Sequence, residues 1–383
     1  MTVDPTLQGQ ENQSVNKALT ALPPPYITGM KLQEDVILGD LVFNAIDENN
    51  IIWVCTDIEG WWVQPDVEMP ELTRGWGDGS YDVKGRWQAR QLTLSGVFLP
   101  PDPSYVPAAR DTLIRATSLV YTGAWLRTFE DPPRASYVRL SGRPEIETVN
   151  ARGRTEFSIG LRAADPIKYE WNEEDPEGYS VTEIPCKNVS TGATGTGIVE
   201  NVGNTTVTAV FEITGPIIGP ATLQNLTTNE LILVIDSLQG SYVRTVANKA
   251  LTSNVATITT STAHELSVDD VVTITGVDAT FNGTHFIEAI PTSTTFTFLK
   301  EAANVASAAS GGTMTKEPDI LEIDTYDHEV ALNGNISGTR SIIDTLADWI
   351  VLYPGDNEIA LVDEGSANST ALLRVYYRSG WIG

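Results

Sequence analysis

The stretch Ile58–Pro103, IEGWWVQPDVEMPELTRGWGDGSYDVKGRWQARQLTLSGVFLPPDP, opens on two adjacent tryptophans and ends in an alternating run. From Trp87 to Phe98 apolar side chains recur at every second position, a pattern that predicts a half-buried β-strand. The segment around Trp76 is too rich in glycine to be a helix and predicts turns. No residue type in this stretch points to catalysis, so it predicts packing and assembly.

The composition favours a folded, mainly β protein. The chain has 383 residues, enough for two or three domains, with 41% hydrophobic and 19% charged residues. Thr, Val, Ile and Gly recur throughout, whereas long runs with helical periodicity are scarce.

The charge is strongly acidic, with a formal net charge of −26 at pH 7. Such a surface repels the phosphates of nucleic acids, which argues against a DNA-binding enzyme and predicts no specific nucleic-acid binding. An acidic protein surface along which DNA passes without binding would be consistent with this charge. The alternative explanation is that the acidic charge only keeps the protein soluble.

The chain carries no pattern that predicts a cofactor, a metal or a catalytic site. Its two cysteines, Cys55 and Cys186, form no metal knuckle and are expected to be reduced and buried. The three histidines lack the spacing of metal ligands, and neither a nucleophile elbow nor a phosphate-binding loop occurs. No signal peptide and no membrane span are expected, so the protein should fold in a cytoplasm.

The pattern of strands and linkers predicts four regions. A flexible N-terminal arm over residues 1–26 precedes a first domain over 27–170. A discontinuous β-sandwich follows over 171–243 and 317–383, and a small β domain over 244–316 is inserted into it. The best helix is expected from Pro107 to Val120, with its apolar side chains on one face.

Several pieces of sequence, in their order and spacing, resemble the distal tail proteins of long-tailed, siphovirus-type bacteriophages. In the first half these are the strand Leu92–Phe98 with the proline-bounded helix after it, and the hairpin that ends in Phe157–Pro166. In the second half they are Asn204-Thr-Thr, Leu321-Glu-Ile-Asp-Thr, Val330-Ala-Leu-Asn-Gly and Leu352-Tyr-Pro-Gly-Asp-Asn. The resemblance spans most of residues 27–383 apart from the insertion.

This resemblance implies a ring-forming belt domain over residues 27–170 and a galectin-like sandwich behind it. It further implies a hexameric ring at the tail tip or baseplate of the virion, joining the tail tube protein to the hub proteins around a channel that passes DNA. No catalytic residue and no cofactor are implied, so the expected protein is not an enzyme.

Aromatic residues supply the candidate sites. The expected anchors for packing or subunit interfaces are Trp61, Trp62, Trp76 and Trp87. The expected contacts to a sugar, by their place in the outer domain, are Trp349, Tyr353 and Trp381.

Two alternatives accompany the structural prediction. The first is a carbohydrate-binding module that attaches the particle to glycans of the host cell wall. The second is a polysaccharide-degrading enzyme with a pair of carboxylates such as Asp324 and Glu358, although so many acidic residues make any such pair uninformative.

Overall fold

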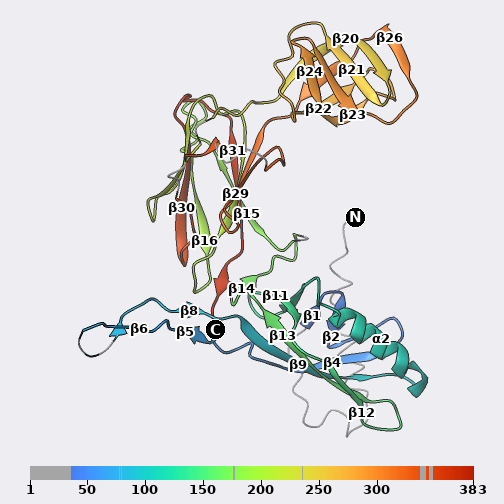
Figure 1. Ribbon diagram of the computed structural model, residues 1–383, viewed down its shortest axis with the longest axis vertical. Helices are drawn as coiled ribbons and strands as arrows, with labels where there is room; N and C mark the ends of the chain where they lie inside the picture. Colours follow the sequence, from blue (N-terminus) through green and yellow to red (C-terminus); the bar gives the residue numbers. More distant parts are fainter. Residues whose placement is uncertain are drawn as a thin grey trace. The chain divides into compact units, whose positions relative to one another are not determined.

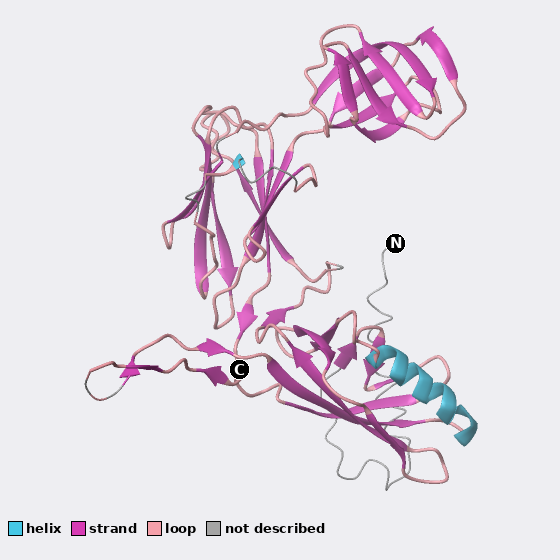
Figure 2. Cartoon of the chain, in the orientation of Figure 1, coloured by secondary structure: helices cyan, strands magenta, loops and turns pink. Residues whose placement is uncertain are grey.

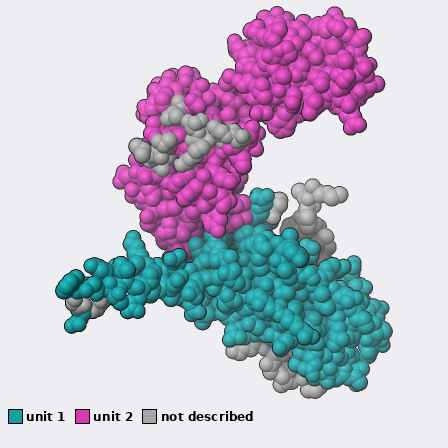
Figure 3. Space-filling model, in the orientation of Figure 1, with its two compact units in different colours: residues 1–178, 380–383 teal, residues 179–379 magenta. Residues whose placement is uncertain are grey.

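The computed structural model describes residues 36–383, apart from residues 77, 79, 176, 235, 337–341 and 345–347. The N-terminal arm expected over residues 1–26 therefore lies outside the described residues. The chain divides into two compact units, the first ending at Gly178 and including Gly380–Gly383, the second spanning Tyr179–Ser379 (Figure 3). The sequence boundaries placed residues 171–178 and 380–383 in the second domain, whereas these units have them in the first.

The described chain is mainly β, as the sequence predicts, and one α-helix lies among its strands (Figure 2). The first unit contains the strands β1 (Val36–Leu38), β2 (Leu41–Phe43), β3 (Ala45–Ile46), β4 (Ile52–Glu59), β5 (Val67–Glu68), β6 (Leu72–Thr73), β7 (Ser80–Tyr81), β8 (Arg86–Trp87), β9 (Arg90–Leu99), β10 (Ala124–Thr128), β11 (Arg134–Leu140), β12 (Glu145–Thr148), β13 (Thr155–Ala163), β14 (Lys168–Glu170) and β32 (Gly380–Trp381).

An antiparallel sheet organises the first unit, in the order β2-β1-β10-β11-β13-β9-β4-β3, with β12 on β13 and β14 between β11 and β32. Strands β9 and β13 form its longest ladder, in which Leu94 faces Ile159. Both alternate between buried and accessible residues, because successive side chains of a strand point to opposite faces. The predicted strand from Trp87 is wrong at its start: β9 begins at Arg90, and Trp87 belongs to the separate strand β8.

Helix α2 (Val106–Thr117) follows the short 3-10 turn η1 (Pro103–Tyr105) and is shorter than the sequence predicts. It buries Ala109, Leu113 and Thr117. Thr117 turns its hydroxyl back to the carbonyl oxygen of Leu113, and the helix ends there. Val120, expected on the apolar face, is exposed beyond the helix end.

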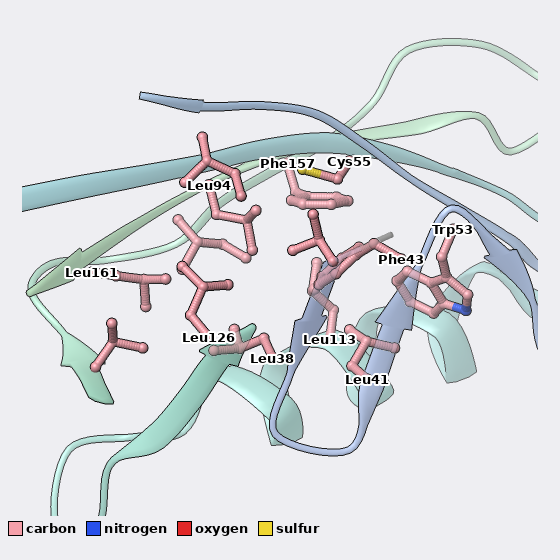
Figure 4. Close-up of a cluster of buried hydrophobic side chains, with 14 of the residues drawn as sticks. Leu38, Leu41, Phe43, Trp53, Cys55, Leu94, Leu113, Leu126, Phe157 and Leu161 are labelled. Carbon is pink, nitrogen blue, oxygen red and sulfur yellow. The ribbon is translucent and has the colours of Figure 1, made fainter. Parts of the chain in front are cut away.

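The core of the first unit lies between the sheet and helix α2. Leu38 and Leu126 from neighbouring strands, Leu94 from β9 and Leu113 from the helix point into one cluster (Figure 4). Trp53 and Phe98 extend it at a ring-centroid distance of 5.1 Å. Burial of these apolar side chains supplies the main stabilising term of the unit.

The second unit contains two antiparallel sheets, of orders β15-β31-β17-β28-β29 and β16-β30-β18-β19, whose strands bury alternate residues as the layers of a sandwich do. Their strands are β15 (Ser180–Pro185), β16 (Thr196–Asn201), β17 (Ala209–Thr214), β18 (Ala221–Asn225), β19 (Glu230–Val234), β28 (Ile320–Asp324), β29 (Glu329–Leu332), β30 (Gly355–Asp363) and β31 (Leu372–Tyr377).

Between β19 and β28 the chain forms a further eight-stranded sheet with its own apolar cluster around Phe281, Phe296 and Phe298. Its strands are β20 (Tyr242–Thr252), β21 (Val255–Thr260), β22 (Val271–Thr275), β23 (Gly283–Phe286), β24 (Ala289–Thr292), β25 (Thr295–Leu299), β26 (Val305–Ala309) and β27 (Thr313–Lys316).

Candidate assembly interface

A two-stranded projection leaves the first sheet between β4 and β9; we call residues 62–88 the aromatic hairpin (Figure 1). Val67 pairs with Trp87 in its first ladder, and Leu72 pairs with Tyr81 in its second. Pro70 lies between the two ladders and has no backbone N–H to donate. In Figure 1 the hairpin extends beyond the sheet at the end opposite helix α2.

The aromatic hairpin exposes large apolar side chains along both limbs. Trp76 is 97% exposed, and the others that the structure leaves accessible are Trp62, Val63, Val67, Met69, Leu72, Tyr81 and Trp87. An isolated two-stranded hairpin is at best marginally stable in water. Exposed apolar side chains that gather on one projection are typical of an interaction site.

The base of the hairpin is fixed by Arg90, a buried guanidinium at the start of β9. Its Nη1 donates to the carbonyl oxygens of Gly60 at 3.0 Å and Val63 at 2.6 Å, and its Nε donates to that of Pro166 at 3.1 Å. Gly60 has a φ of +86°, and a side chain there would collide with the carbonyl of Gln91. The chain therefore leaves the sheet in one defined direction.

A second buried cation, Lys168 of β14, supports the same corner. Its Nζ donates to the carbonyl oxygen of Trp61 at 3.1 Å and lies 5.1 Å and 5.3 Å from the ring centroids of Trp61 and Trp62. Carbonyl dipoles and π faces compensate a charge that burial removes from water. Burial lowers the pKa of Lys168 to about 8, although the carboxylate of Glu130 acts in the opposite direction.

Trp61 links this corner to the rest of the unit. Its ring is fully buried, and Nε1 donates to Oε1 of Glu130 at 2.8 Å. Glu130 also accepts from the hydroxyl of Thr128 at 2.9 Å and lies 3.2 Å from the guanidinium of Arg134. Arg134 in turn lies over the ring of Trp381, 4.3 Å from its centroid. The hairpin therefore projects from a hydrogen-bonded and closely packed base.

The titration of Lys168 gives a testable dependence on pH. Its pKa is 10.5 in an unfolded chain and about 8 in the folded one, so its stabilising contribution is complete above pH 10.5 and is lost as pH falls through 8. From pH 7 to pH 9 the free energy of unfolding of the wild type, relative to Lys168→Met, should rise by about 1.4 kcal/mol.

Urea unfolding followed by tryptophan fluorescence measures this difference, because Trp349 is the single tryptophan between residues 179 and 379 and the signal comes mainly from the first unit. If the free energy of unfolding of the wild type relative to Lys168→Met stays constant or falls with rising pH, Lys168 is not the group whose pKa is lowered by burial.

The four predicted interface tryptophans lie in one region but in two environments. Trp61 is buried at the base, whereas Trp62, Trp76 and Trp87 are exposed on the hairpin. The sequence interpretation missed Arg90, Lys168 and Glu130. The sequence does contain a signal that Arg90 is buried, because Arg90 has the same parity in β9 as the inward-facing Leu92 and Leu94.

The three predicted sugar contacts differ in exposure and in surroundings. Trp381 is only 8% exposed and belongs to β32 of the first unit. One face of Trp349 stacks on His328 at 4.4 Å between ring centroids. Tyr353 is 46% exposed, and its backbone N–H donates to Asn357.

Other chemical groups are placed as follows. Cys55 and Cys186 are free and buried as predicted, and burial raises the pKa of Cys55 to about 12. Asp324 lies in β28 and Glu358 in β30, which belong to different sheets. Within the described ranges no cluster of three His, Cys, Asp or Glu residues could hold a metal ion. None of the helices described there is long and apolar enough to span a membrane.

No family model matches the chain, and no curated protein matches it. Among solved structures, the SPP1 Dit protein, described as a paradigm of the hub adsorption apparatus in phages infecting Gram-positive bacteria, aligns with 85% of this chain and 93% of its own at 12% identity and a TM-score of 0.43. The phage P2 baseplate in its activated conformation aligns at 6% identity in two forms. The form with calcium covers 89% of this chain and 96% of the other at a TM-score of 0.35, and the form with strontium covers 90% and 97% at 0.34. The solved structures to which this chain is similar are thus a phage hub protein and a phage baseplate, each at a TM-score below 0.5.

Proposed function

We propose that this chain is a structural, non-enzymatic subunit of a bacteriophage tail tip, and that its first unit joins other copies of itself into a closed ring. The observation that carries the proposal is the aromatic hairpin. It holds a row of exposed apolar side chains on a base that Arg90 and Lys168 fix in place.

The apolar side chains of the hairpin need a partner surface. Trp76 and Leu72 lie on a ribbon of two strands that has no core of its own to bury them. Aromatic anchors with fixed backbones are the residues that contribute most to protein interfaces, because little conformational entropy is lost when they bind. A projection of one copy that inserts into another makes a heterologous contact, and repetition of that contact gives a ring when the rotation between successive copies closes.

The remaining parts of the proposal follow from the family resemblance and from charge. The ring would have six copies and would join the tail tube protein to the hub proteins of the virion. The net charge of −26 would keep DNA from binding to the wall of its channel.

Removal of the aromatic hairpin should abolish the ring. In the test variant an Asn-Gly turn replaces residues 68–86 and keeps the anchored base, since this dipeptide closes two-residue hairpins. Light scattering and negative-stain imaging should find rings for the full chain and monomers for the variant. Phe286→Ser, which removes an aromatic that is 64% exposed on the inserted domain, is the matched control and should leave the rings intact.

Two outcomes would overturn the proposal. One is a full-length chain that stays monomeric at high concentration. The other is a hairpin-deleted chain, folded by circular dichroism, that still forms rings of the original size.

A further inference from the structure

Strand β32 belongs to the first unit, although the whole second unit lies between it and β14 in the sequence. It pairs with β14 and is the red strand beside it in Figure 1. Both residues of β32 are buried, and Trp381 is 8% exposed. We call residues 60–66 and 88–90 the hairpin base. Two routes connect β32 to this base.

The first route runs through the backbone of β14. The ladder between β11 and β14 contains Glu170 and Tyr169 and stops there, whereas Lys168 pairs with Trp381 of β32. The ammonium group of Lys168 donates to the carbonyl oxygen of Trp61 at 3.1 Å. Strand β32 therefore holds in place the residue whose side chain fixes the hairpin base.

The second route runs through the side chain of Trp381. Its ring centroid lies 4.3 Å from the guanidinium carbon of Arg134, a cation–π contact. Arg134 lies 3.2 Å from Glu130, and Glu130 accepts a hydrogen bond from Nε1 of Trp61 at 2.8 Å. Both routes from β32 therefore end on Trp61, one at its carbonyl oxygen and the other at its ring.

The fold of the second unit determines where β32 begins. Strand β31 pairs with β15 as far as Tyr377, opposite Ser180, and two residues separate it from β32. The second of these, Ser379, accepts the backbone N–H of Val202 at 3.2 Å. If the second unit unfolds, the pairing of β32 with β14 has to close a loop as long as that unit, which costs more conformational entropy. Unfolding of the second unit therefore weakens the hold of β32 on the hairpin base.

We propose that β32 is a strap that fixes the direction of the aromatic hairpin, and that it stays in place only in a chain whose second unit is folded. Trp381 is the positioning residue of the strap and acts on Trp61 by the two routes. A chain with an unfolded second unit would have a loose hairpin and would join a ring poorly. That last consequence rests on the proposed function, whereas the strap itself does not.

Hydrogen exchange at the hairpin base tests the role of Trp381. The backbone N–H of Gln88 donates to the carbonyl oxygen of Asp66 at 2.7 Å, so exchange there reports whether the base is closed. Trp381→Ala should speed exchange in the base at least tenfold. Trp381→Phe should stay within about threefold of the wild type, because phenylalanine keeps a π face beside Arg134. Strand β13 is the internal reference and should keep its rate.

The matched control is Tyr353→Ala, which removes an exposed aromatic side chain from the second unit and should change neither rate. Unchanged exchange at the base in Trp381→Ala would overturn the role of Trp381. An equal acceleration in β13 would do the same, because it would show a general loss of stability. So would a Trp381→Phe chain that exchanges as fast as Trp381→Ala.

Pulses of hydrogen exchange at increasing urea concentration test the link to the second unit. In the wild type the hairpin base should lose its protection at the same urea concentration as β31, while β13 is still protected. Loss of protection in the base at a different concentration from β31 would overturn the link. Simultaneous loss in the base, β31 and β13 would also overturn it, since the whole chain would then unfold as one.

Ring assembly separates this inference from the proposed function. A fixed hairpin loses less conformational entropy on binding, so Trp381→Ala should raise the concentration needed for rings at least tenfold, and Trp381→Phe should restore it to within about threefold. Equal concentrations for the wild type and Trp381→Ala would overturn the control of assembly by the strap. If the wild type forms no rings, the proposed function fails, and the exchange rates still decide whether β32 holds the hairpin.

Discussion

Trp61→Ala is expected to lower the free energy of unfolding of the first unit by about 3–5 kcal/mol, as other truncations of a buried tryptophan do. The ring is fully buried and donates to Glu130, so the substitution opens a cavity and leaves this carboxylate without one of its donors. It also removes a π face from beneath the ammonium group of Lys168. The loss should therefore exceed that from the cavity alone.

Urea unfolding of the full chain, followed by fluorescence, measures the effect of Trp61→Ala. Trp76→Ala is the matched control, because the same side chain is 97% exposed there and its removal should change stability by less than about 0.5 kcal/mol. We further expect Trp76→Ala to weaken ring assembly while the fold persists. Equal losses of stability in the two variants would show that Trp61 does not anchor the base of the hairpin.

The strands of the first unit could be predicted because their signals are local. In β9 and β13 alternate residues are apolar, and one buried face of a sheet imposes this period. The hairpin's turn-rich sequence also predicted that residues around Trp76 would not form a helix. What local patterning could not supply is which tryptophan is buried, since Trp61 and Trp62 are adjacent and differ only in which side of the chain they occupy.

The anchors of the hairpin were missed because they come from distant parts of the sequence. Arg90 in β9 and Lys168 in β14 donate hydrogen bonds to carbonyl oxygens of residues 60–63. The sequence of residues 60–63 contains no pattern that predicts these donors. Trp381 was assigned to the outer domain by its place near the end of the chain. Only the pairing of β32 with β14, in which Trp381 faces Lys168, places it in the first unit. Long-range strand pairing thus set the limits of the sequence interpretation.

Lys316→Met is expected to destabilise the second unit by about 3–5 kcal/mol, the cost of removing one partner from a buried ion pair. Lys316 ends β27 and is fully buried, with its Nζ 2.7 Å from Oδ1 of Asp319 and 3.7 Å from that of Asp270. Each carboxylate also accepts a backbone N–H, from Gln239 and Ser267 respectively. These hydrogen bonds hold both carboxylates in place, so neither can turn to water when the ammonium group is lost.

Low pH should partly reverse the loss of stability caused by Lys316→Met. This pH dependence distinguishes the loss of the ammonium charge from the loss of side-chain packing. Burial already raises the pKa of Asp270 in the wild type, and removal of the ammonium group raises it further. A carboxyl group whose folded pKa lies above its unfolded one binds more protons in the folded state, so lowering the pH from 7 to 5 should narrow the stability gap to the wild type. Lys249→Met is the matched control, since its partner Asp278 is more exposed, and the expected cost is about 0–1 kcal/mol. Calorimetry of the full chains at pH 7 and pH 5 decides between the two explanations. A stability difference from the wild type that does not change with pH would assign the loss to packing of the lysine stem instead of to the two buried carboxylates.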